Sequence, residues 1–318
     1  MVIHQLDAAP PPDLQRALQE FEASFLIPFT PGRFFRIDYG GDRTAFIRSL
    51  GEGRCFAGEK DGRIVGLIEI AVVNLLLPGG EARTAGYIAD IKVRPEDRRK
   101  MGTARLLQKA MEWGQSKTDF GFTVTLDETP IKPSDYTGRA GILKFSEAGR
   151  LVVVRLPAAN GAAVGEGGRR FVAKPEDARE IFKRLSKGRY ALLGGSPGDR
   201  SDSPPAWLAH PSGLACARFE DRRKVRRLIA DDGVELRPAY LSCFAFQDPR
   251  AALELIGAAA ARAGALGFRA LRICLPPSDL AQLRPGLGSD LMVGGGGSVF
   301  ATAAAKEKAP WNLNAAEI

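Results

Sequence analysis

Residues 88–110 read IADIKVRPEDRRKMGTARLLQKA and join a strand-like run to a helix-like run through a basic loop. The strand pattern ends at Pro95, because proline cannot donate a hydrogen bond to a sheet ladder. Leucine and alanine then recur at helical spacing from about Gly102 onward. The first backbone amides of a helix have no intrahelical partners, and the helix dipole places partial positive charge there. This junction therefore predicts a site for an anion.

Three basic residues, Arg98, Arg99 and Lys100, lie immediately before the predicted helix. Basic side chains at a helix start oppose the helix dipole, so an isolated fold would favour Asp or Glu there. The missing side chain at Gly102 would let a ligand approach the backbone closely. A strand–loop–helix junction of this kind suits a pyrophosphate. The alternative is a solvated basic loop without a ligand.

The chain has 318 residues, enough for about two domains. Its content of 45% hydrophobic and 26% charged residues is typical of a globular protein. No apolar run is long enough to cross a bilayer, and residues 1–15 lack the pattern of a signal peptide. We therefore expect a cytoplasmic protein without membrane association. The net charge of +8 permits an anionic partner but does not identify one.

Cysteine and histidine content argues against several kinds of chemistry. The four cysteines form no CxxC pair, and we expect them to be buried free thiols (Cys55, Cys216, Cys243 and Cys274). With only two histidines, His4 and His210, the sequence has little material for a zinc site or a Ser-His-Asp triad. We expect no metal site.

A basic run from Arg222 to Arg227 raises the question of nucleic-acid binding. Acidic residues flank this run, and no aromatic residues interleave with it to form stacking platforms. We therefore expect a charged hairpin or helix face there, and no nucleic-acid partner.

The hydrophobic pattern predicts a mixed α/β order that repeats coarsely in the two halves. The first half predicts helices near 13–25, 44–50 and 102–113, and strands within 55–77, 81–93, 121–126 and 151–157, with a hairpin turn at Lys60-Asp61-Gly62. A glycine- and alanine-rich loop or linker, 157–170, follows. The second half predicts helices over 174–188 and 248–268, and strands within 213–223, 233–246, 268–276 and 294–305. We expect two domains, 1–156 and 157–318.

Residues 93–107, VRPEDRRKMGTARLL, resemble the acyl-CoA signature V-x-P-x-x-[RQ]-x-x-G-x-[GA] of the GCN5-related N-acetyltransferases (GNAT). The upstream hairpin, the long strand, the crossover helix and the strand after it also match the order of that family. Counted from the proline, Arg98 takes the place of the motif arginine, and Met101 and Thr103 take the glycine positions. Counted from the glycine, the run 99–104 fits R-x-x-G-x-A with one extra loop residue. We favour the second alignment, because the glycine lets phosphate oxygens reach the amides.

The resemblance implies a GNAT-like α+β acyl-CoA N-acyltransferase fold, as two tandem domains with a central, mostly antiparallel sheet each. It implies that the pyrophosphate of acetyl-CoA binds at Arg98, Arg99, Lys100, Met101, Gly102, Thr103 and Ala104. It also implies a splayed strand whose backbone pairs with the pantetheine arm at Ile91, Lys92 and Val93. The implied activity is N-acetyl transfer from acetyl-CoA to an amine of a small molecule or peptide. The sequence does not indicate which amine, or the oligomeric state.

Acetyl transfer to an amine requires a base that takes up the amine proton. In the family that the sequence resembles, a glutamate or an ordered water on the central strands often serves as this base. Glu69 and Asp90 are the matching candidates, and Asp127 and Glu128 are further ones. Strict alternation places Asp90 opposite Tyr87, on the solvated face of its strand. Each carboxylate could also be an ordinary surface residue.

The departing thiolate benefits from an acid, which in the family is often a tyrosine after the fifth strand. The matching segment here is LKFSEAGRL, with Phe145 in place of the tyrosine and Gly149 in place of a glycine. Phenylalanine cannot donate a proton. Tyr136 is the nearest substitute, and it could equally be a packing residue. Loss of the acid would favour an alternative function, that of a non-catalytic acyl-CoA-binding or regulatory protein.

The matching junction of the second half, residues 243–257, lacks the R-x-x-G-x-[GA] pattern. Instead, Asp248 is placed as a helix N-cap, with Pro249 at the first helical position. A carboxylate there would occupy the amides that a pyrophosphate needs and would repel it. We therefore predict a degenerate second domain that binds no CoA and shapes or covers the substrate cleft. The alternative is an unrelated α+β domain.

Overall fold

The computed structural model of this protein describes residues 1–318 apart from 31, 99, 130, 140, 160–169 and 289–290. The first half contains β1 (Val2–Leu6), α1 (Pro12–Ala23), β2 (Ile27–Thr30), β3 (Arg33–Asp38), α2 (Ala45–Leu50), β4 (Glu52–Lys60), β5 (Arg63–Leu76), β6 (Ala82–Val93), the 3₁₀ turn η1 (Pro95–Asp97), α3 (Met101–Gln115), β7 (Gly121–Leu126), α4 (Pro133–Tyr136) and β8 (Ser146–Pro157). The second half contains α6 (Pro175–Leu185), β9 (Tyr190–Leu192), α7 (Pro197–Arg200), β10 (Ala206–Ala209), β11 (Ala215–Glu220), β12 (Arg227–Ala230), β13 (Pro238–Phe246), α8 (Pro249–Ala265), β14 (Ala270–Leu275), α9 (Pro277–Leu283), η2 (Arg284–Gly286), β15 (Met292–Ala301) and β16 (Trp311–Asn312). Most of the glycine- and alanine-rich segment 157–170 lies outside the described residues.

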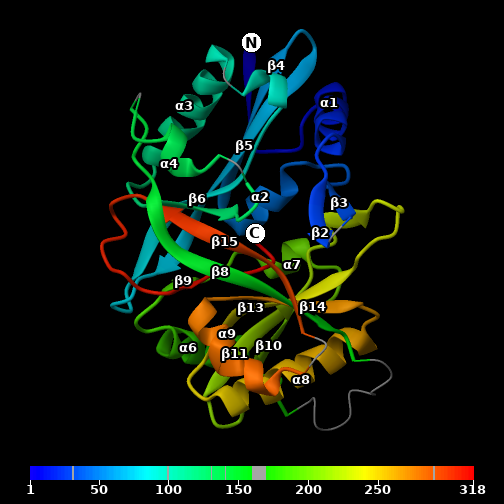
Figure 1. The fold of residues 1–318 in the computed structure, drawn as a ribbon, viewed down its shortest axis with the longest axis vertical. Helices are drawn as coiled ribbons and strands as arrows, with labels where there is room; N and C mark the ends of the chain where they lie inside the picture. Colours follow the sequence, from blue (N-terminus) through cyan, green and yellow to red (C-terminus); the bar gives the residue numbers. More distant parts are fainter. Residues whose placement is uncertain (31, 99, 130, 140, 160–169, 289–290) are drawn as a thin grey trace.

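One continuous sheet runs through both halves (Figure 1). Its central order is β1-β4-β5-β6-β7-β15-β8-β14-β13-β11-β10. Among the described strands, β6 with β7, β13 with β14 and β9 with β16 pair in parallel, and the other neighbours pair antiparallel. The predicted mixed α+β class with mostly antiparallel pairing is therefore confirmed, whereas the prediction of a separate sheet in each half is wrong.

The two halves exchange one strand each at the centre of this sheet. Strand β8 precedes the linker, yet it pairs with β14 of the second half, with Val154 opposite Ile273. Strand β15 comes from the second half, yet it lies between β7 and β8, with Val299 opposite Val124 of β7. Each half is thus completed by a strand from the other. The boundary at 156/157 stays a prediction, and it does not divide the sheet.

Several local signals in the sequence correspond to the observed elements. Asp61 and Gly62 have φ values of 51° and 75°, and two left-handed residues in a row make the tight turn that a two-residue hairpin requires. The predicted hairpin is therefore confirmed. Helices α1, α6 and α8 each begin with a proline, whose missing N–H costs nothing in the first turn.

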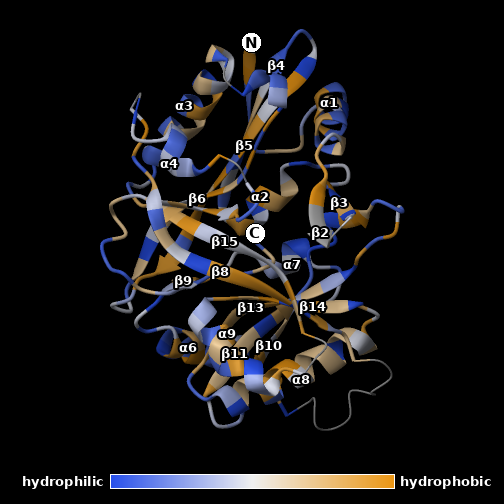
Figure 2. Cartoon of the chain, in the orientation of Figure 1, coloured by the Kyte–Doolittle hydropathy of each residue, from blue (hydrophilic) through white to orange (hydrophobic). Residues whose placement is uncertain are grey.

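Helices cover both faces of the first half of the sheet. Leu18 of α1 packs with Leu67 of β5 on one face, and Leu106 of α3 packs with Ile68 of β5 on the opposite face. Figure 2 shows hydrophobic residues along the strands and a mixture of hydrophobic and hydrophilic residues on the helices. Both faces of β5 are therefore core, which explains its nearly continuous apolar sequence.

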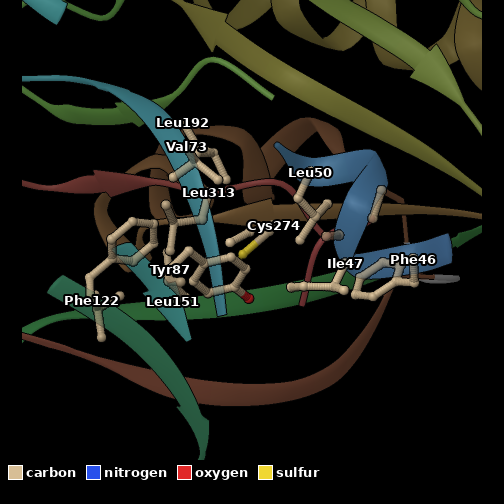
Figure 3. Close-up of a cluster of buried hydrophobic side chains, with 14 of the residues drawn as sticks. Phe46, Ile47, Leu50, Val73, Tyr87, Phe122, Leu151, Leu192, Cys274 and Leu313 are labelled. Atoms are coloured by element: carbon tan, nitrogen blue, oxygen red, sulfur yellow. The ribbon is translucent and has the colours of Figure 1, made fainter. Parts of the chain in front are cut away.

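A larger core lies where the two halves meet (Figure 3). It combines side chains from α2, β6 and β7 with side chains from β14 and the segment after β16, including Phe46, Tyr87, Phe122, Cys274 and Leu313. All four cysteines are buried and free, as expected. The shared core means that neither half buries its own apolar surface alone.

The basic run that begins at Arg222 differs from our expectation of a charged hairpin or helix face. Arg222 and Arg226 are buried, with exposed fractions of 4% and 9%. Strand β12 then continues from Arg227 and pairs with β3 of the first half. This run therefore forms part of the contact between the halves. Within the described residues, no helix is long and apolar enough to cross a membrane.

Candidate active site

Strands β6 and β7 separate at the centre of the first half. They pair in parallel only at Gly86–Gly121, Tyr87–Phe122 and Ile88–Thr123. Beyond this point β6 continues to Val93 with β5 alone, while β7 pairs with β15. The backbone edge of β6 that faces β7 is thus open over residues 89–93. This is the splayed strand that the resemblance implied.

A β-bulge lies at the start of this opening. Ile88 is opposite Ile70 and Asp90 is opposite Glu69, so Ala89 is an extra residue in β6. The extra residue reverses the alternation of side chains beyond it. Asp90 therefore lies on the same face as Tyr87, toward α1 and α2. Our prediction that Asp90 lies opposite Tyr87 on a solvated face is wrong for this reason.

Helix α3 begins without a side-chain cap. Its N-cap residue is Lys100, and no side chain of the described residues accepts a hydrogen bond from its first amides. The amides of Thr103 and Ala104 reach the Lys100 carbonyl at 3.1 and 3.4 Å, whereas those of Met101 and Gly102 have no partner among the described residues. Two unpaired amides at the positive end of a helix can bind an anion.

The structure describes two of the three basic residues of the loop. Arg98 and Lys100 are exposed, and Lys100 pairs with the Asp97 carboxylate at 2.7 Å. Arg99 lies outside the described residues. Thr103 Oγ1 donates to the Asp97 carbonyl at 2.6 Å, which fixes the turn before α3.

Gly102 has a packing role that the sequence did not reveal. A Cβ atom on this residue would lie 2.8 Å from the Sδ atom of Met1. Its missing side chain therefore makes room for the Met1 side chain, whereas we expected it to make room for a ligand.

Arg43 is the centre of a buried ion cluster beside the opening. Only 1% of this residue is exposed, and it lies just before α2. Its guanidinium contacts Glu22 of α1 at 2.8 Å, Glu69 of β5 at 2.5 Å and Asp90 of β6 at 3.3 Å. The cluster therefore holds Glu69 and Asp90, two of the four predicted base candidates, on one face of the sheet.

Lys92 and Tyr39 complete this cluster. The Lys92 Nζ atom contacts Glu22 at 2.7 Å and Asp90 at 2.8 Å. The Tyr39 hydroxyl donates to Asp90 at 3.4 Å, and the Arg43 guanidinium lies 3.5 Å from the centre of the Tyr39 ring. Lys92, predicted only for its backbone, thus also orients Asp90 through its side chain.

The two carboxylates have pKa values that shift in opposite directions. Burial raises the pKa of Glu69 to about 7, with further contributions from Asp90 and Glu22, although Arg43 opposes the shift. Burial would also raise the pKa of Asp90, but Lys92 and Arg43 outweigh it and lower that pKa below its usual value. The Oε2 atom of Glu69 is buried and has no hydrogen-bond partner. Glu69 is therefore the carboxylate suited to gain and lose a proton near neutral pH.

The proposed acid and the other residues named from the sequence make no contact with the ion cluster. Tyr136 ends α4 and is half-buried, and burial followed by the nearby Asp135 raises its pKa to about 12. Phe145 is 3% exposed and packs in the core beneath α3, so it is a packing residue. Asp127 is bound to Arg150 at 2.9 Å, and Glu128 is exposed. These two carboxylates lie away from the ion cluster.

An open groove of about 640 Å³ lies near the strand exchange. The groove is lined by residues from the segment before β8, from β8 itself, from the end of β7 and from β15. They include Asp127, Lys144, Glu147, Arg150 and Ser298. None of Glu69, Asp90 and Tyr136 lines it. The groove is therefore separate from the ion cluster.

The second half contains a matching opening that its own chain fills. Strand β13 pairs with β14 only from Pro238 to Leu241, and it has a bulge at Cys243, where φ is 48°. Asn312 donates to the Phe244 carbonyl at 2.8 Å, and the Cys243 amide donates to Asn314 at 2.7 Å. Side chains from the end of the chain therefore occupy the backbone groups that are open in β6.

Helix α8 begins as predicted. Asp248 is its N-cap, and the Asp248 carboxylate accepts a hydrogen bond from the Arg250 amide at 2.9 Å. Pro249 is the first helical residue. The first turn of α8 is thus capped by a carboxylate, whereas the first turn of α3 has no side-chain cap.

Sequence reasoning missed three members of the ion cluster. Arg43 and Tyr39 lie in a segment without periodicity, so no local pattern identifies them. Glu22, however, lies four residues after Leu18 and one after Phe21, on the apolar face of α1. A carboxylate on the buried face of a helix requires a partner, and this signal could have been used. Among the described residues, no group of three or more His, Cys, Asp or Glu side chains could hold a metal ion.

Comparisons with known proteins found one matching family model and several solved structures with a similar fold. Residues 6–119 match the family described as Acetyltransferase (GNAT) domain. No curated protein matches the chain by sequence. Solved structures of Saccharomyces cerevisiae N-myristoyltransferase with bound myristoyl-CoA are similar, one with a TM-score of 0.60 and 14% identity, covering 99% of this chain and 82% of that one. A GCN5-related N-acetyltransferase from Anabaena variabilis gives a TM-score of 0.52 and 12% identity, covering 94% of this chain and 72% of that one. At such identities the structural likeness shows the fold alone.

Proposed function

We propose that this chain transfers the acetyl group of acetyl-CoA to an amine of a small molecule or peptide, because residues 6–119 match the family described as Acetyltransferase (GNAT) domain. The observation that carries the proposal is the opening between β6 and β7, together with the uncapped start of α3 and the ion cluster beside them. These three features support the proposal, because they suit an extended arm, a phosphate group and a proton acceptor, respectively.

The residues at the start of α3 suit the phosphate groups of acetyl-CoA. The amides of Met101 and Gly102 would donate to the pyrophosphate, with Arg98 and Lys100 adding positive charge. The open edge of β6 at Ile91, Lys92 and Val93 would pair with the pantetheine arm, as in strand addition. When bound, acetyl-CoA supplies an acetyl group activated as a thioester.

Glu69 is proposed as the general base. Its unpartnered Oε2 atom can accept the proton of the amine, directly or through a water, and its pKa of about 7 fits that role. Asp90, held by Lys92 and Arg43, would stay ionised and attract the cationic form of the amine. Tyr136 keeps its proton, because its pKa is raised, and is proposed as the acid for the leaving thiolate.

Titration calorimetry of the full-length chain with acetyl-CoA tests the first part of this proposal. We expect a dissociation constant in the micromolar range, and no detectable binding at millimolar acetyl-CoA would reject it. Thiol release in the presence of an amine panel then tests transfer. Acetylated products identified by mass spectrometry would establish which amines are accepted.

A non-catalytic acyl-CoA-binding protein is the second candidate, favoured by the buried Phe145 at the position where the family often has a tyrosine. It predicts binding of acetyl-CoA without thiol release for any amine of the panel. For the second half we propose a degenerate GNAT-like domain without CoA binding. The cap at Asp248 and the filling of the β13 opening support that proposal.

A further inference from the structure

The groove near the strand exchange continues into a second hollow. The first part, of about 640 Å³, and the second, of about 570 Å³, share the side chains of Lys144, Ser146 and Glu147. The second part extends along the segment after β15, residues 302–310, and its lining includes several alanines. Each volume is within the range of ligand-binding sites. We call the two parts together the lysine groove, after Lys132, Lys144, Lys306 and Lys308.

Small residues of β15 make the floor of the first part low. Gly296, Ser298 and Phe300 alternate onto the same face of this strand. A Cβ atom on Gly296 would lie 2.3 Å from the Oδ2 atom of Asp127, so the missing side chain leaves room for that carboxylate over the strand. Phe300, which is 4% exposed, lies at the bottom of the groove. The hollow therefore follows from the sequence of β15.

A β-bulge in β8 brings two charged residues onto this face. Glu147 is opposite Phe300 of β15. Arg150 is opposite Ser298, so β8 has one residue more than β15 over this stretch. The extra residue places Glu147 and Arg150 on the same face, whereas regular alternation would separate residues three positions apart. Bulges often turn side chains toward binding sites, and this one directs both charges into the groove.

Two carboxylates of the groove already have donors. Arg150 donates to Asp127 at 2.9 Å and to the Ser298 hydroxyl at 3.1 Å. Ser298 in turn donates to the Oε1 atom of Glu147 at 2.9 Å. This chain of hydrogen bonds occupies the carboxylates of the first part, so they are not the partners of the surrounding lysines.

The lysines of the groove have no carboxylate partners. Lys144, Lys306 and Lys308 are exposed and make no ion pair or side-chain hydrogen bond with the described residues. Lys132 donates only to the backbone oxygens of Leu126 and Asp127, at 3.3 and 3.2 Å. Among the described lining residues, five cations (Lys132, Lys144, Arg150, Lys306 and Lys308) face three carboxylates (Asp127, Glu147 and Glu307). The groove therefore suits an anionic partner.

We propose that the lysine groove binds an extended acidic segment of a peptide or protein partner. Phe300 is the single aromatic residue among the described lining residues, and its burial leaves no ring on which a nucleic-acid base could stack. The two hollows adjoin along the start of β8, which suits a chain better than a single ion. Serine hydroxyls and Glu147 can bond the amide groups of a peptide backbone, while the lysines bond its carboxylates. The site is separate from the proposed acetyl-CoA site.

A pair of matched peptides tests this proposal with the full-length chain. One is a fluorescently labelled peptide of alternating Glu and Ser, and the other has Gln in place of every Glu. Fluorescence anisotropy measures the dissociation constant of each. We expect the Glu peptide to bind about tenfold more tightly at low salt, and this difference to shrink as salt is added. Equal affinities of the two peptides at low salt would overturn the proposal.

Charge reversals locate the site on the molecule. Lys144→Glu changes a residue of both parts of the groove, and Lys306→Glu changes a residue of the second part. We expect each to weaken binding of the Glu peptide about tenfold and to leave the thermal midpoint of the exposed variant unchanged. Lys60→Glu is the matched control, because it makes the same change in charge at the exposed end of β4. An equal loss in all three variants would show attraction to net charge alone and would overturn the proposal.

Two further measurements separate the peptide from other anions. Acetyl-CoA affinity should be the same in Lys144→Glu as in the wild type, and a loss as large as that for the peptide would assign the groove to the cofactor instead. A single-stranded oligonucleotide that binds more tightly than the Glu peptide, and loses its affinity in Lys144→Glu, would also overturn the proposal. The peptide measurements require no acetyl transfer, so failure of the proposed function and failure of this inference give different results.

Discussion

Glu69 and Asp90 show how two neighbouring carboxylates receive different roles from their surroundings. They are opposite each other on β5 and β6, and both contact Arg43. Only Asp90 also contacts Lys92 and Tyr39, and this second cation keeps it ionised. Glu69 has an unpartnered oxygen and full burial instead. The difference in pKa follows from these contacts and not from the residue types.

The pH dependence of the reaction should reveal which carboxylate is the base. A base must be deprotonated to act, so kcat/KM should rise with pH through about 7 if Glu69 serves. Glu69→Gln should remove this rise and lower kcat about 100-fold or more. Asp90→Asn is the matched control, and it should keep the rise near pH 7, because the pKa of Asp90 is lowered. A profile that keeps its rise in Glu69→Gln would assign the base elsewhere.

The same group affects folding stability in a defined direction. The pKa of Glu69 is about 7 in the folded protein against a usual value of 4.5, so the folded state favours the protonated form. Its contribution to stability is therefore complete below about pH 4.5 and is lost as pH rises through about 7. Urea unfolding at several pH values should therefore show that the free energy of unfolding falls less between about pH 4.5 and pH 7 in Glu69→Gln than in the wild type.

Arg43 should matter more for stability than any exposed arginine nearby. Arg43→Met would leave Glu22, Glu69 and Asp90 without their shared cation, and removing one partner of a buried pair costs about 3–5 kcal/mol. Arg48→Met is the control, since its pair with Asp42 is partly exposed and contributes less than about 1 kcal/mol. Urea midpoints measure both changes, and similar losses in the two variants would refute a central role for Arg43.

Part of the candidate site could be predicted from residues alone. Glu69 is the single charge in the run IVGLIEIAVV, and such a charge in a buried strand needs a partner. Its partner Arg43 comes from a loop 26 positions away, and no spacing rule connects the two. The basic residues 98–100 and Gly102 could be proposed as a phosphate site from the sequence, because such sites use contiguous backbone.

At the scale of elements, α3 and α8 begin differently although they occupy matching places after β6 and β13. Asp248 accepts a hydrogen bond from the first turn of α8, whereas Lys100 leaves the first amides of α3 unpaired. Helix starts without a cap are less stable by about 1 kcal/mol. The open start is therefore a cost to the fold that binding of an anion would offset.

Converting the start of α3 to that of α8 tests this interpretation. Lys100→Asp places a carboxylate at the N-cap, where it can accept from the amides and repel phosphate. We expect acetyl-CoA to bind at least tenfold more weakly while the unfolding free energy changes by less than about 1 kcal/mol, because the lost pair with Asp97 is exposed at its lysine end. Lys109→Asp is the matched control, because it makes the same change in charge on the exposed face of α3. Its affinity for acetyl-CoA should stay near that of the wild type.

The strand elements also show where sequence patterns stop being informative. The hairpin at Asp61-Gly62 was predictable, because its turn chemistry is local. The bulge at Ala89 was not, since an alanine in a strand carries no signal of an extra residue. That one residue moved Asp90 from an expected solvated face into the ion cluster. Prediction of the face fails after any bulge, even where the strand itself is predicted correctly.

At the scale of the whole molecule, the exchange of β8 and β15 makes the two halves one unit. The alternation of strands and helices predicted the order of elements, but pairing partners as distant as Val124 and Val299 have no local signature. The prediction of two separate sheets failed for that reason. The core between the halves, with Tyr87 from one and Cys274 from the other, has the same origin.

Such an arrangement should unfold in a single step, and the tryptophans can report on it. Trp113 packs against Phe56 in the first half, and Trp207 lies on β10 near the far edge of the sheet. Two variants, each with one of these tryptophans kept and the other changed to Phe, report on the halves separately. Trp311 is changed to Phe in both variants. Because each half needs a strand of the other, we expect coincident urea midpoints by fluorescence and by circular dichroism. Midpoints that differ between the two variants, with Trp311→Phe alone as the control for stability, would mean that the halves unfold independently despite their shared sheet.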